Sequence, residues 1–299
     1  MIFKIFYAIL IFFVMNSVQA KVSILTTTAN LKAIAQEVGG DKVSVYSFCK
    51  GSQDPHYLEA KPSYMLKTNR SDLIVAVGLG LEEGWLPRVL AGGRNANVMP
   101  GKNGYLEVGT LLDVIEVATK NTTRAEGDVH PQGNPHVTLD PIRVGLIAEK
   151  IAERLALLDQ SNATEYKKRA LALKARLSLK LKEWEKRVKK TGIEQVVSYH
   201  KTFNYFFDRF SLKNPAILEP LPGVPPTAAH IVSVINKIVK NGVRLILVEN
   251  YFDESVAKRV ARDVKGIRVE SVPVSVGGRE DIQSIDDLFE NIVKSFEKQ

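Results

Sequence analysis

One periodic pattern constrains the fold more than any other feature of this sequence. Between Tyr166 and Val188, apolar residues recur with gaps of 4, 3, 4, 4, 3 and 4: Tyr166, Ala170, Leu173, Leu177, Leu181, Trp184 and Val188. This spacing is typical of one face of an amphipathic helix. We place that helix at residues 161–191, with Asn162 and Glu165 at capping-box spacing and Gly192 after its end. About thirty residues at 1.5 Å each span about 45 Å, so we expect a rigid helix that joins two lobes.

The segments on either side of this helix alternate between strand-like and helix-like patterns. Leu73–Val77 and Arg244–Val248 are short, mostly apolar runs, as in strands that are buried on both faces of a parallel sheet. Asp140-Pro141 is a typical helix start. The alternation predicts an α/β fold with two parallel-sheet lobes, at residues 21–160 and 192–299, joined by the long helix.

The first 20 residues have the three parts of a secretory signal peptide. A positive charge at Lys4 precedes an apolar run from Ile5 to Val14, and Val18-Gln19-Ala20 forms a small-residue cleavage site. The apolar run is shorter than the roughly twenty residues that a bilayer-spanning helix needs. We therefore expect cleavage after Ala20 and a soluble periplasmic protein, with an uncleaved membrane anchor as the alternative.

The composition is that of an ordinary globular protein. Of the 299 residues, 45% are hydrophobic and 25% are charged, which excludes a disordered or collagen-like chain. The single cysteine, Cys49, excludes an intramolecular disulfide framework, and we expect it to be a small buried side chain. The net charge is +8, with basic residues concentrated between Lys167 and Lys190. We interpret them as a solvated helix face and predict no nucleic-acid partner.

Three of the five histidines lie where ligands bind in α/β proteins. His56 lies in a loop after one predicted strand, His136 lies before a predicted helix, and His200 directly follows another predicted strand. Ligands of open α/β sheets bind outside the carboxyl ends of the strands, so we expect these residues to converge in one cleft between the lobes. Three neutral imidazoles suit Zn²⁺, whereas sites for Mg²⁺ or Mn²⁺ are richer in carboxylates. Spacing alone does not distinguish a joint site from three separate hydrogen-bonded histidines.

The remaining histidines and the known catalytic motifs give weaker signals. His130 falls in a polar stretch that we expect to be a surface loop, where it could capture metal transiently. His230 falls in the first turn of a predicted helix, where we expect a surface or capping role. The sequence contains no GxGxxG, P-loop or GxSxG motif, and we predict no catalytic residues.

Four motifs, in order along the chain, resemble those of the extracytoplasmic metal-binding receptors of bacterial zinc and manganese ABC importers. They are Asp54-Pro55-His56-Tyr57 with Lys61-Pro62-Ser63, the apolar run 73–78 with Gly80-Leu81-Glu82 and Trp85-Leu86, Gly133-Asn134-Pro135-His136 with Leu139-Asp140-Pro141, and residues 198–206. The resemblance implies two α/β lobes joined by a long helix, with metal in the cleft between them. It also implies a monomer that captures a divalent metal outside the inner membrane and delivers it to an ABC permease. Manganese-type members carry Glu where this chain has His200, so the resemblance favours Zn²⁺ over Mn²⁺.

The chain departs from the family pattern at the fourth metal ligand. The family commonly takes this ligand from an Asp after the last strand of the second lobe, and the corresponding residues 272–278 contain no carboxylate. Glu249, which follows a predicted strand, is our candidate for the fourth ligand. Glu280 and Asp281 are further options, and a water molecule is another alternative.

Two other functions are compatible with the sequence. Three histidines and a bound water also form the site of a catalytic zinc, in which Glu249 would serve as the general base, although no HExxH motif is present. A surface adhesin is the second alternative, and the basic surface charge is the only sequence feature that favours it.

Overall fold

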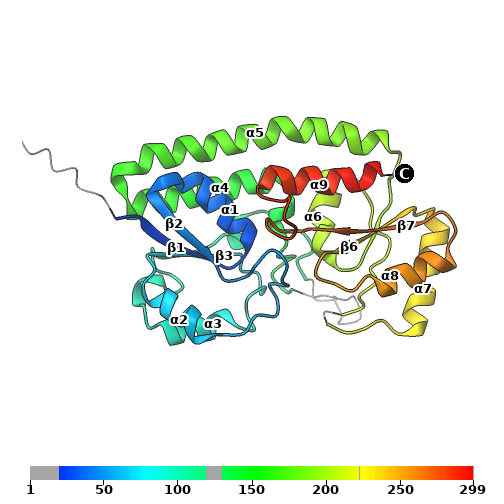
Figure 1. Cartoon of the computed structure of the whole chain (residues 1–299), viewed down its shortest axis with the longest axis horizontal. Helices are drawn as coiled ribbons and strands as arrows, with labels where there is room; N and C mark the ends of the chain where they lie inside the picture. Colours follow the sequence, from blue (N-terminus) through cyan, green and yellow to red (C-terminus); the bar gives the residue numbers. More distant parts are fainter. Residues whose placement is uncertain (1–19, 119–129, 222, 299) are drawn as a thin grey trace, which may run out of the picture.

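Two parallel sheets form the centre of the molecule (Figure 1). The structure is a computed structural model that describes residues 20–118, 130–221 and 223–298. The first sheet has the order β2-β1-β3-β4, with strands β1 (Val22–Thr26), β2 (Val43–Ser47), β3 (Leu73–Ala76) and β4 (Tyr105–Glu107). The second has the order β5-β6-β7, with strands β5 (Val197–Ser198), β6 (Leu245–Glu249) and β7 (Arg268–Val272). All pairings between these strands are parallel, which confirms the predicted α/β class.

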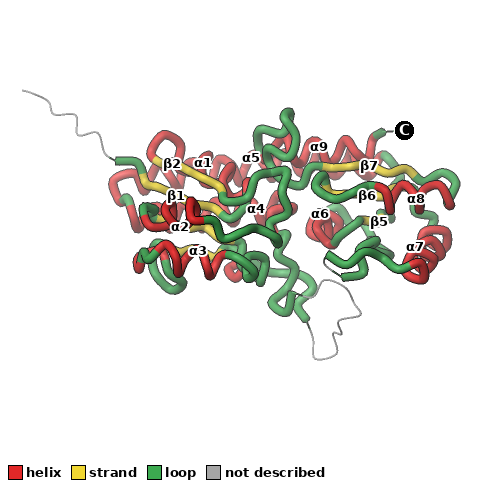
Figure 2. The backbone as a smooth tube through the Cα atoms, turned by 60° about the horizontal axis from the view of Figure 1, so that its bottom comes forward, coloured by secondary structure: helices red, strands yellow, loops and turns green. Residues whose placement is uncertain are grey.

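Helices cover both faces of the two sheets (Figures 1 and 2). The N-terminal half contains α1 (Ala29–Gly39), α2 (Pro62–Asn69), α3 (Leu86–Gly93) and α4 (Pro141–Leu158). The C-terminal half contains α6 (Asn204–Arg209), α7 (Ala228–Asn241), α8 (Ser255–Asp263) and α9 (Ile285–Glu297). Among the described residues, no helix is both long enough and apolar enough to cross a bilayer. The predicted signal peptide lies outside the described residues as far as residue 19.

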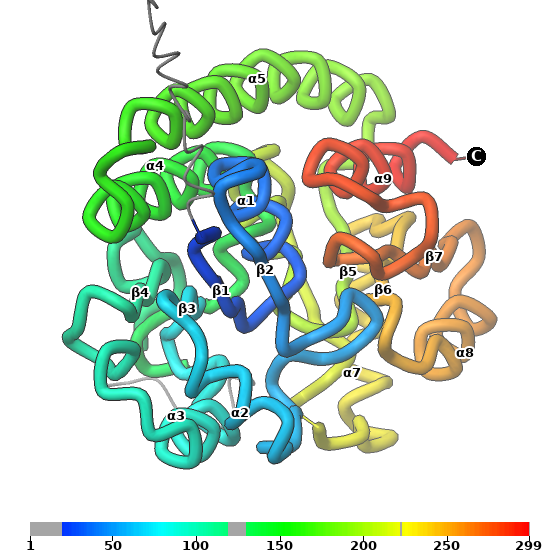
Figure 3. Tube along the Cα trace, turned by 60° about the vertical axis from the view of Figure 1, so that its left-hand side comes forward, coloured from blue at the N-terminus to red at the C-terminus, as the bar shows by residue number. Residues whose placement is uncertain are grey.

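The long helix α5 (Ala163–Lys190) runs along one side of the molecule, beside both α4 and α9 (Figures 1 and 3). Its 28 residues confirm a single helix within the predicted segment. Its start differs from the prediction, because the Asn162 side chain makes no capping bond. The amide Nδ2 of Asn162 instead donates to Oδ2 of Asp159, at 2.7 Å, and this interaction replaces the expected capping box.

One apolar core extends beneath α5 and joins the two halves of the chain. All seven residues of the predicted stripe are buried in it. The same core contains Val75 of the first sheet, Leu247 of the second and Phe289 of α9. Two further buried clusters cover the opposite faces of the two sheets. Because α5 packs on a core that both halves share, moving one half against the other would expose apolar surface and cost free energy.

Buried hydrogen bonds also tie the two halves together. The side chain of Asn30, in α1, is 2% exposed. Its Nδ2 donates to Thr138 Oγ1 at 3.1 Å and to the carbonyl of Val274 at 3.0 Å, and its Oδ1 accepts from the amide of Val276 at 2.9 Å. The fully buried Asp140, at the start of α4, accepts two hydrogen bonds from Arg209 of α6. These contacts fix the connection after β7 and helix α6 against the N-terminal half.

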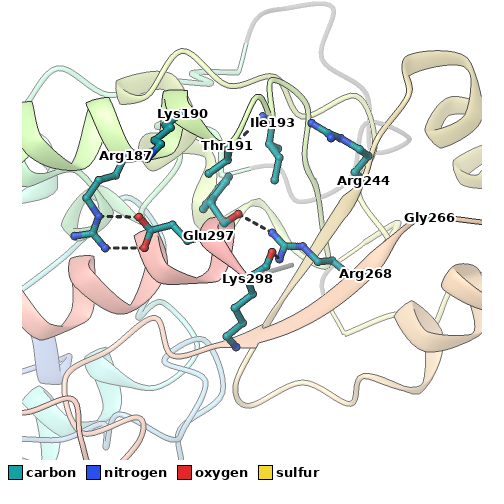
Figure 4. A pocket seen from close by; sticks show the side chains of 10 residues that line it. Arg187, Lys190, Thr191, Ile193, Arg244, Gly266, Arg268, Glu297 and Lys298 are labelled. Carbon is teal, nitrogen blue, oxygen red and sulfur yellow. Dashed lines mark hydrogen bonds and ion pairs between the residues drawn. The ribbon is translucent and has the colours of Figure 1, made fainter.

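Ion pairs at the far end of α5 hold α9 in place (Figure 4). Arg187 of α5 forms paired hydrogen bonds with Glu297 and with Glu290, at 2.8–2.9 Å. Glu290 also accepts from the Trp184 indole at 3.0 Å. The Arg187 guanidinium and the Trp184 hydrogen bond lower the pKa of Glu290 to about 2.

We predict that Glu290→Gln lowers the free energy of unfolding by about 1 kcal/mol at pH 7, because the pair is partly exposed and screened by solvent. The pKa of about 2 in the fold lies below the ordinary value of 4.5. The carboxylate therefore stabilises the protein above about pH 4.5, and this contribution is lost as the pH falls toward 2. Urea unfolding at pH 7 and pH 3 measures the change, and we expect a smaller difference at pH 3.

Glu183→Gln is the matched control for this prediction. Glu183 also faces Arg187, at 3.7 Å, but its side chain is 68% exposed. We expect its loss to change stability by less than about 0.3 kcal/mol. An equal effect of the two substitutions at pH 7 would show that the Glu290 pair has no special role.

Candidate metal centre

The structure brings three of the five histidines together. His56, His136 and His200 each offer a ring nitrogen, and the three nitrogens lie within 4.8 Å of one another. The ring centroids are 5.4 Å apart for His56 and His136, 5.4 Å for His56 and His200, and 5.2 Å for His136 and His200. The first two histidines come from the N-terminal half and the third from the C-terminal half, so the group exists only when both halves are in place.

Each of the three rings is held by an oxygen acceptor at Nδ1. Oδ1 of Asp54 lies 2.6 Å from Nδ1 of His56, and Oδ1 of Asn134 lies 2.8 Å from Nδ1 of His136. Oε2 of Glu219 lies 2.6 Å from Nδ1 of His200. Each of these oxygens accepts a hydrogen bond from a protonated Nδ1. The neutral ring in this tautomer carries its free lone pair on Nε2. The Nε2 atoms of the three rings are buried.

A short sequence motif positions His56 and His136 in the same way. In both Asp54-Pro55-His56 and Asn134-Pro135-His136, the first side chain also accepts from the backbone amide of the histidine, at 2.9 Å. This closes an Asx turn over the proline, whose φ angle is restricted by its ring. The repeated Asx-Pro-His pattern is visible in the sequence, and it could have identified Asp54 and Asn134 as positioning residues.

Glu219 has no comparable local signal, because it lies 19 residues after His200. Ile217 forms a parallel bridge with Ser198, and the amide of Glu219 donates to the carbonyl of Tyr199 at 2.8 Å. This isolated bridge lies outside the named strands. It brings the carboxylate, which is 6% exposed, next to the ring of His200. Oε1 of Glu219 also accepts from the amide of Gly223 at 2.6 Å, which links the ring to the following loop.

Glu249 lies near the histidines but outside the group of three. It is the last residue of β6 and is fully buried, and neither carboxylate oxygen has a hydrogen-bond partner of normal geometry among the described residues. Burial raises the pKa of Glu249 to about 7, and His200 opposes this shift. The two further candidates, Glu280 and Asp281, are exposed, and Asp281 pairs with Arg279, which lowers its pKa.

The remaining two histidines have different surroundings. Nε2 of His230 lies 3.0 Å from the carbonyl of Ile217, and its backbone amide donates to the hydroxyl of Thr227, which is the residue that caps α7. His130 was expected on a surface loop. It is half-buried, and its ring centroid lies 5.5 Å from that of His56.

Comparison with known proteins agrees with this arrangement. Residues 24–298 match the family described as zinc-uptake complex component A, periplasmic. The chain is 29% identical over 254 residues to the metal ABC transporter substrate-binding lipoprotein FimA of Streptococcus parasanguinis, covering 83% of this chain and 78% of FimA. It is 27% identical over 248 residues to the manganese ABC transporter substrate-binding lipoprotein PsaA of Streptococcus pneumoniae, covering 81% of this chain and 76% of PsaA.

A solved structure shares the fold. The laminin-binding protein Lmb of Streptococcus agalactiae, described as bifunctional with adhesin and metal-transporting activity, superimposes with a TM-score of 0.75–0.76 across its two determinations. It is 22% identical and covers 92% of this chain and 98% of its own. The family match spans nearly the whole chain and includes all three converging histidines. The chain therefore belongs to the zinc-uptake complex component A family, the metal-binding receptors of ABC importers.

Proposed function

We propose that this protein captures Zn²⁺ in the periplasm and delivers it to an ABC permease of the inner membrane. The observation that carries the proposal is the convergence of His56, His136 and His200. The Nδ1 atoms of these rings are hydrogen-bonded to Asp54, Asn134 and Glu219, respectively. Acceptors at Nδ1 fix the ring orientation and raise the basicity of the metal-binding nitrogen.

The spacing of the rings fits a tetrahedral ion. Zn–N bonds of about 2.0–2.1 Å in tetrahedral geometry place the centroids of bound imidazoles about 5 Å apart. The observed centroid distances are 5.2–5.4 Å. Little rearrangement is then needed for the three Nε2 atoms to meet a common ion, which favours tight binding because less ordering is required.

The donor set favours Zn²⁺ over Mn²⁺. The group of three contains nitrogen donors and no carboxylate. Imidazole suits Zn²⁺, whereas carboxylate and water suit Mn²⁺. The relative PsaA is named for manganese, so the choice of metal within this family depends on the residues of each site, and in this chain those residues are histidines.

The signal-peptide pattern of residues 1–20 supports export, and we propose that the mature protein begins at Lys21 and acts as a monomer. The shared core and the Asn30 hydrogen bonds favour a receptor that binds its ion without a large hinge motion. We assign no metal-binding role to the exposed Glu280 and Asp281.

We propose that Glu249 acts as a buried negative charge near the ion. The three imidazole ligands themselves carry no negative charge to offset the double positive charge of a bound Zn²⁺, and a further buried carboxylate would add to the attraction that Asp54 and Glu219 exert on the cation. This role does not require Glu249 to enter the group of three histidines.

We predict that residues 21–299, stripped of metal with a chelator, bind one Zn²⁺ per chain and bind Mn²⁺ at least about 10-fold more weakly. His200→Ala removes one of three ligands and is expected to abolish tight zinc binding, as measured by calorimetry. His230→Ala is the control and should bind as the wild type does, because its ring contacts the carbonyl of Ile217 instead. Absence of stoichiometric binding of either metal would overturn the proposed function.

Glu219→Gln tests the positioning of His200. Because the amide is a weaker acceptor and carries no charge, we predict a roughly 10–100-fold loss of zinc affinity with one ion still bound per chain. Competition with a chromophoric chelator measures the loss. The control is Glu254→Gln, which removes the charge of a partly exposed ion pair with Lys258 of α8 and should leave affinity unchanged. Equal affinities of Glu219→Gln and the wild type would contradict a positioning role.

Glu249→Gln separates an electrostatic role from direct ligation. We predict a loss of zinc affinity of about 10-fold, because a negative charge near the cation is removed. The absorption spectrum of the Co²⁺-loaded protein should stay that of the wild type, since the ligand atoms are the same. A changed Co²⁺ spectrum would instead identify Glu249 as a ligand.

A further inference from the structure

The three histidines leave one position of a tetrahedral ion without an assigned protein donor. The loop after β7 does not supply one, because residues 272–278 contain no carboxylate. Its backbone is engaged with α1 instead, through the carbonyl of Val274 and the amide of Val276, both of which bond to Asn30. A fourth ligand atom from the protein would therefore come from another segment near the three histidines.

His130 lies next to the group on the side of His56. Its ring centroid is 5.5 Å from that of His56, close to the 5.2–5.4 Å that separate the three grouped rings. The two rings are inclined by 32°. The Nε2 atom of His130 is buried, although the residue follows a polar stretch of sequence. This imidazole is thus adjacent to the proposed ion, whereas its sequence context predicts a surface loop with at most a transient contact with metal.

The chain makes room for this ring at Gly80. A Cβ at this position would lie 3.2 Å from Nδ1 of His130. Gly80 has a φ angle of +85°, which disfavours any other residue there. The preceding Gly78 and Leu79 also have positive φ angles, of 80° and 56°. The ring therefore packs against a tight turn in which two of the three residues are glycines.

Buried hydrogen bonds fix this turn. The carboxylate of Glu82, which is 4% exposed, accepts from the amides of Val77 and Gly78, each at 2.9 Å. On the other side, the amide of Gly133 donates to the carbonyl of His130 at 2.9 Å. That hydrogen bond connects His130 to the Asn134-Pro135-His136 turn, so His130 and His136 belong to one ordered segment.

We propose that His130 is a fourth imidazole ligand of the transported ion. This inference rests on the proposed function. The nitrogen of His130 lies outside the 4.8 Å group, so its ring moves toward the ion when metal binds. Three ligands then come from the N-terminal half of the chain and His200 alone comes from the C-terminal half. A set of four imidazoles selects Zn²⁺ and Co²⁺ over Mn²⁺ more strongly than three imidazoles and a water.

The test compares His130→Ala with the wild type, both loaded with Co²⁺ alone and with Zn²⁺ alone. In His130→Ala a water oxygen replaces a ring nitrogen, so the visible absorption bands of the Co²⁺ protein should shift and change in intensity. Zinc affinity should fall by about 10–100-fold with one ion still bound, the size of effect expected when a metal site is weakened but not lost. His130→Asn is the second variant, which keeps a polar side chain beside Gly80, and both variants should unfold without metal at the wild-type temperature.

The outcomes separate this proposal from the function on which it rests. Co²⁺ spectra and zinc affinities of both His130 variants that equal those of the wild type and of the His230→Ala control would overturn the ligand role of His130. In that case the wild type and His200→Ala still report on the three-histidine site. If the wild type itself binds neither metal, or if His200→Ala binds as well as the wild type, the proposed function fails instead.

Discussion

The apolar core beneath α5 is the constraint on which the rest of the structure depends. The stripe from Tyr166 to Val188 is buried along its full length in a core that also contains residues of both sheets. Each sheet alone is small, and the second has only three strands. By sharing one core, the two halves bury more apolar surface than either could separately, and their relative position becomes part of the stable fold. A metal site whose ligands come from both halves can then be prepared before the ion arrives.

The orientation of the three histidine ligands is set by the oxygen atoms that accept hydrogen bonds from their Nδ1 atoms. A histidine can offer either ring nitrogen, and the oxygen at Nδ1 decides the choice. Asp54 and Asn134 do this locally, by the same Asx turn that orients the backbone, while Glu219 does it across a parallel bridge. Two of the three acceptors are carboxylates, which add negative charge near the proposed cation. The same side chains therefore orient the histidine rings and supply negative charge near the proposed cation.

The sequence predicts features that depend on local pattern and misses those that depend on tertiary contacts. The α5 stripe follows from helical periodicity, and strand β6 follows from a short apolar run. Asn162 does not cap α5, because its side chain is instead oriented by the hydrogen bond from its Nδ2 to Asp159. Glu219 is missed because its contact with His200 depends on a single bridge between distant segments. His130 was assigned to a surface loop because polar neighbours in sequence say nothing of the glycine turn against which it packs.

A rigid frame also limits how an ion can leave. The Asn30 and Asp140 contacts hold the two halves together, so separating them would break buried hydrogen bonds as well as expose the core. The ligands themselves lie on loops, where motion costs less. His200 is connected through Glu219 to the amide of Gly223. The hydroxyl of Tyr57, next to His56, lies 3.1 Å from where a Cβ added at Gly223 would stand. Displacement of Gly223 would therefore weaken the hold of Glu219 on His200, a single ligand, while the core and the contacts between the two halves stay intact.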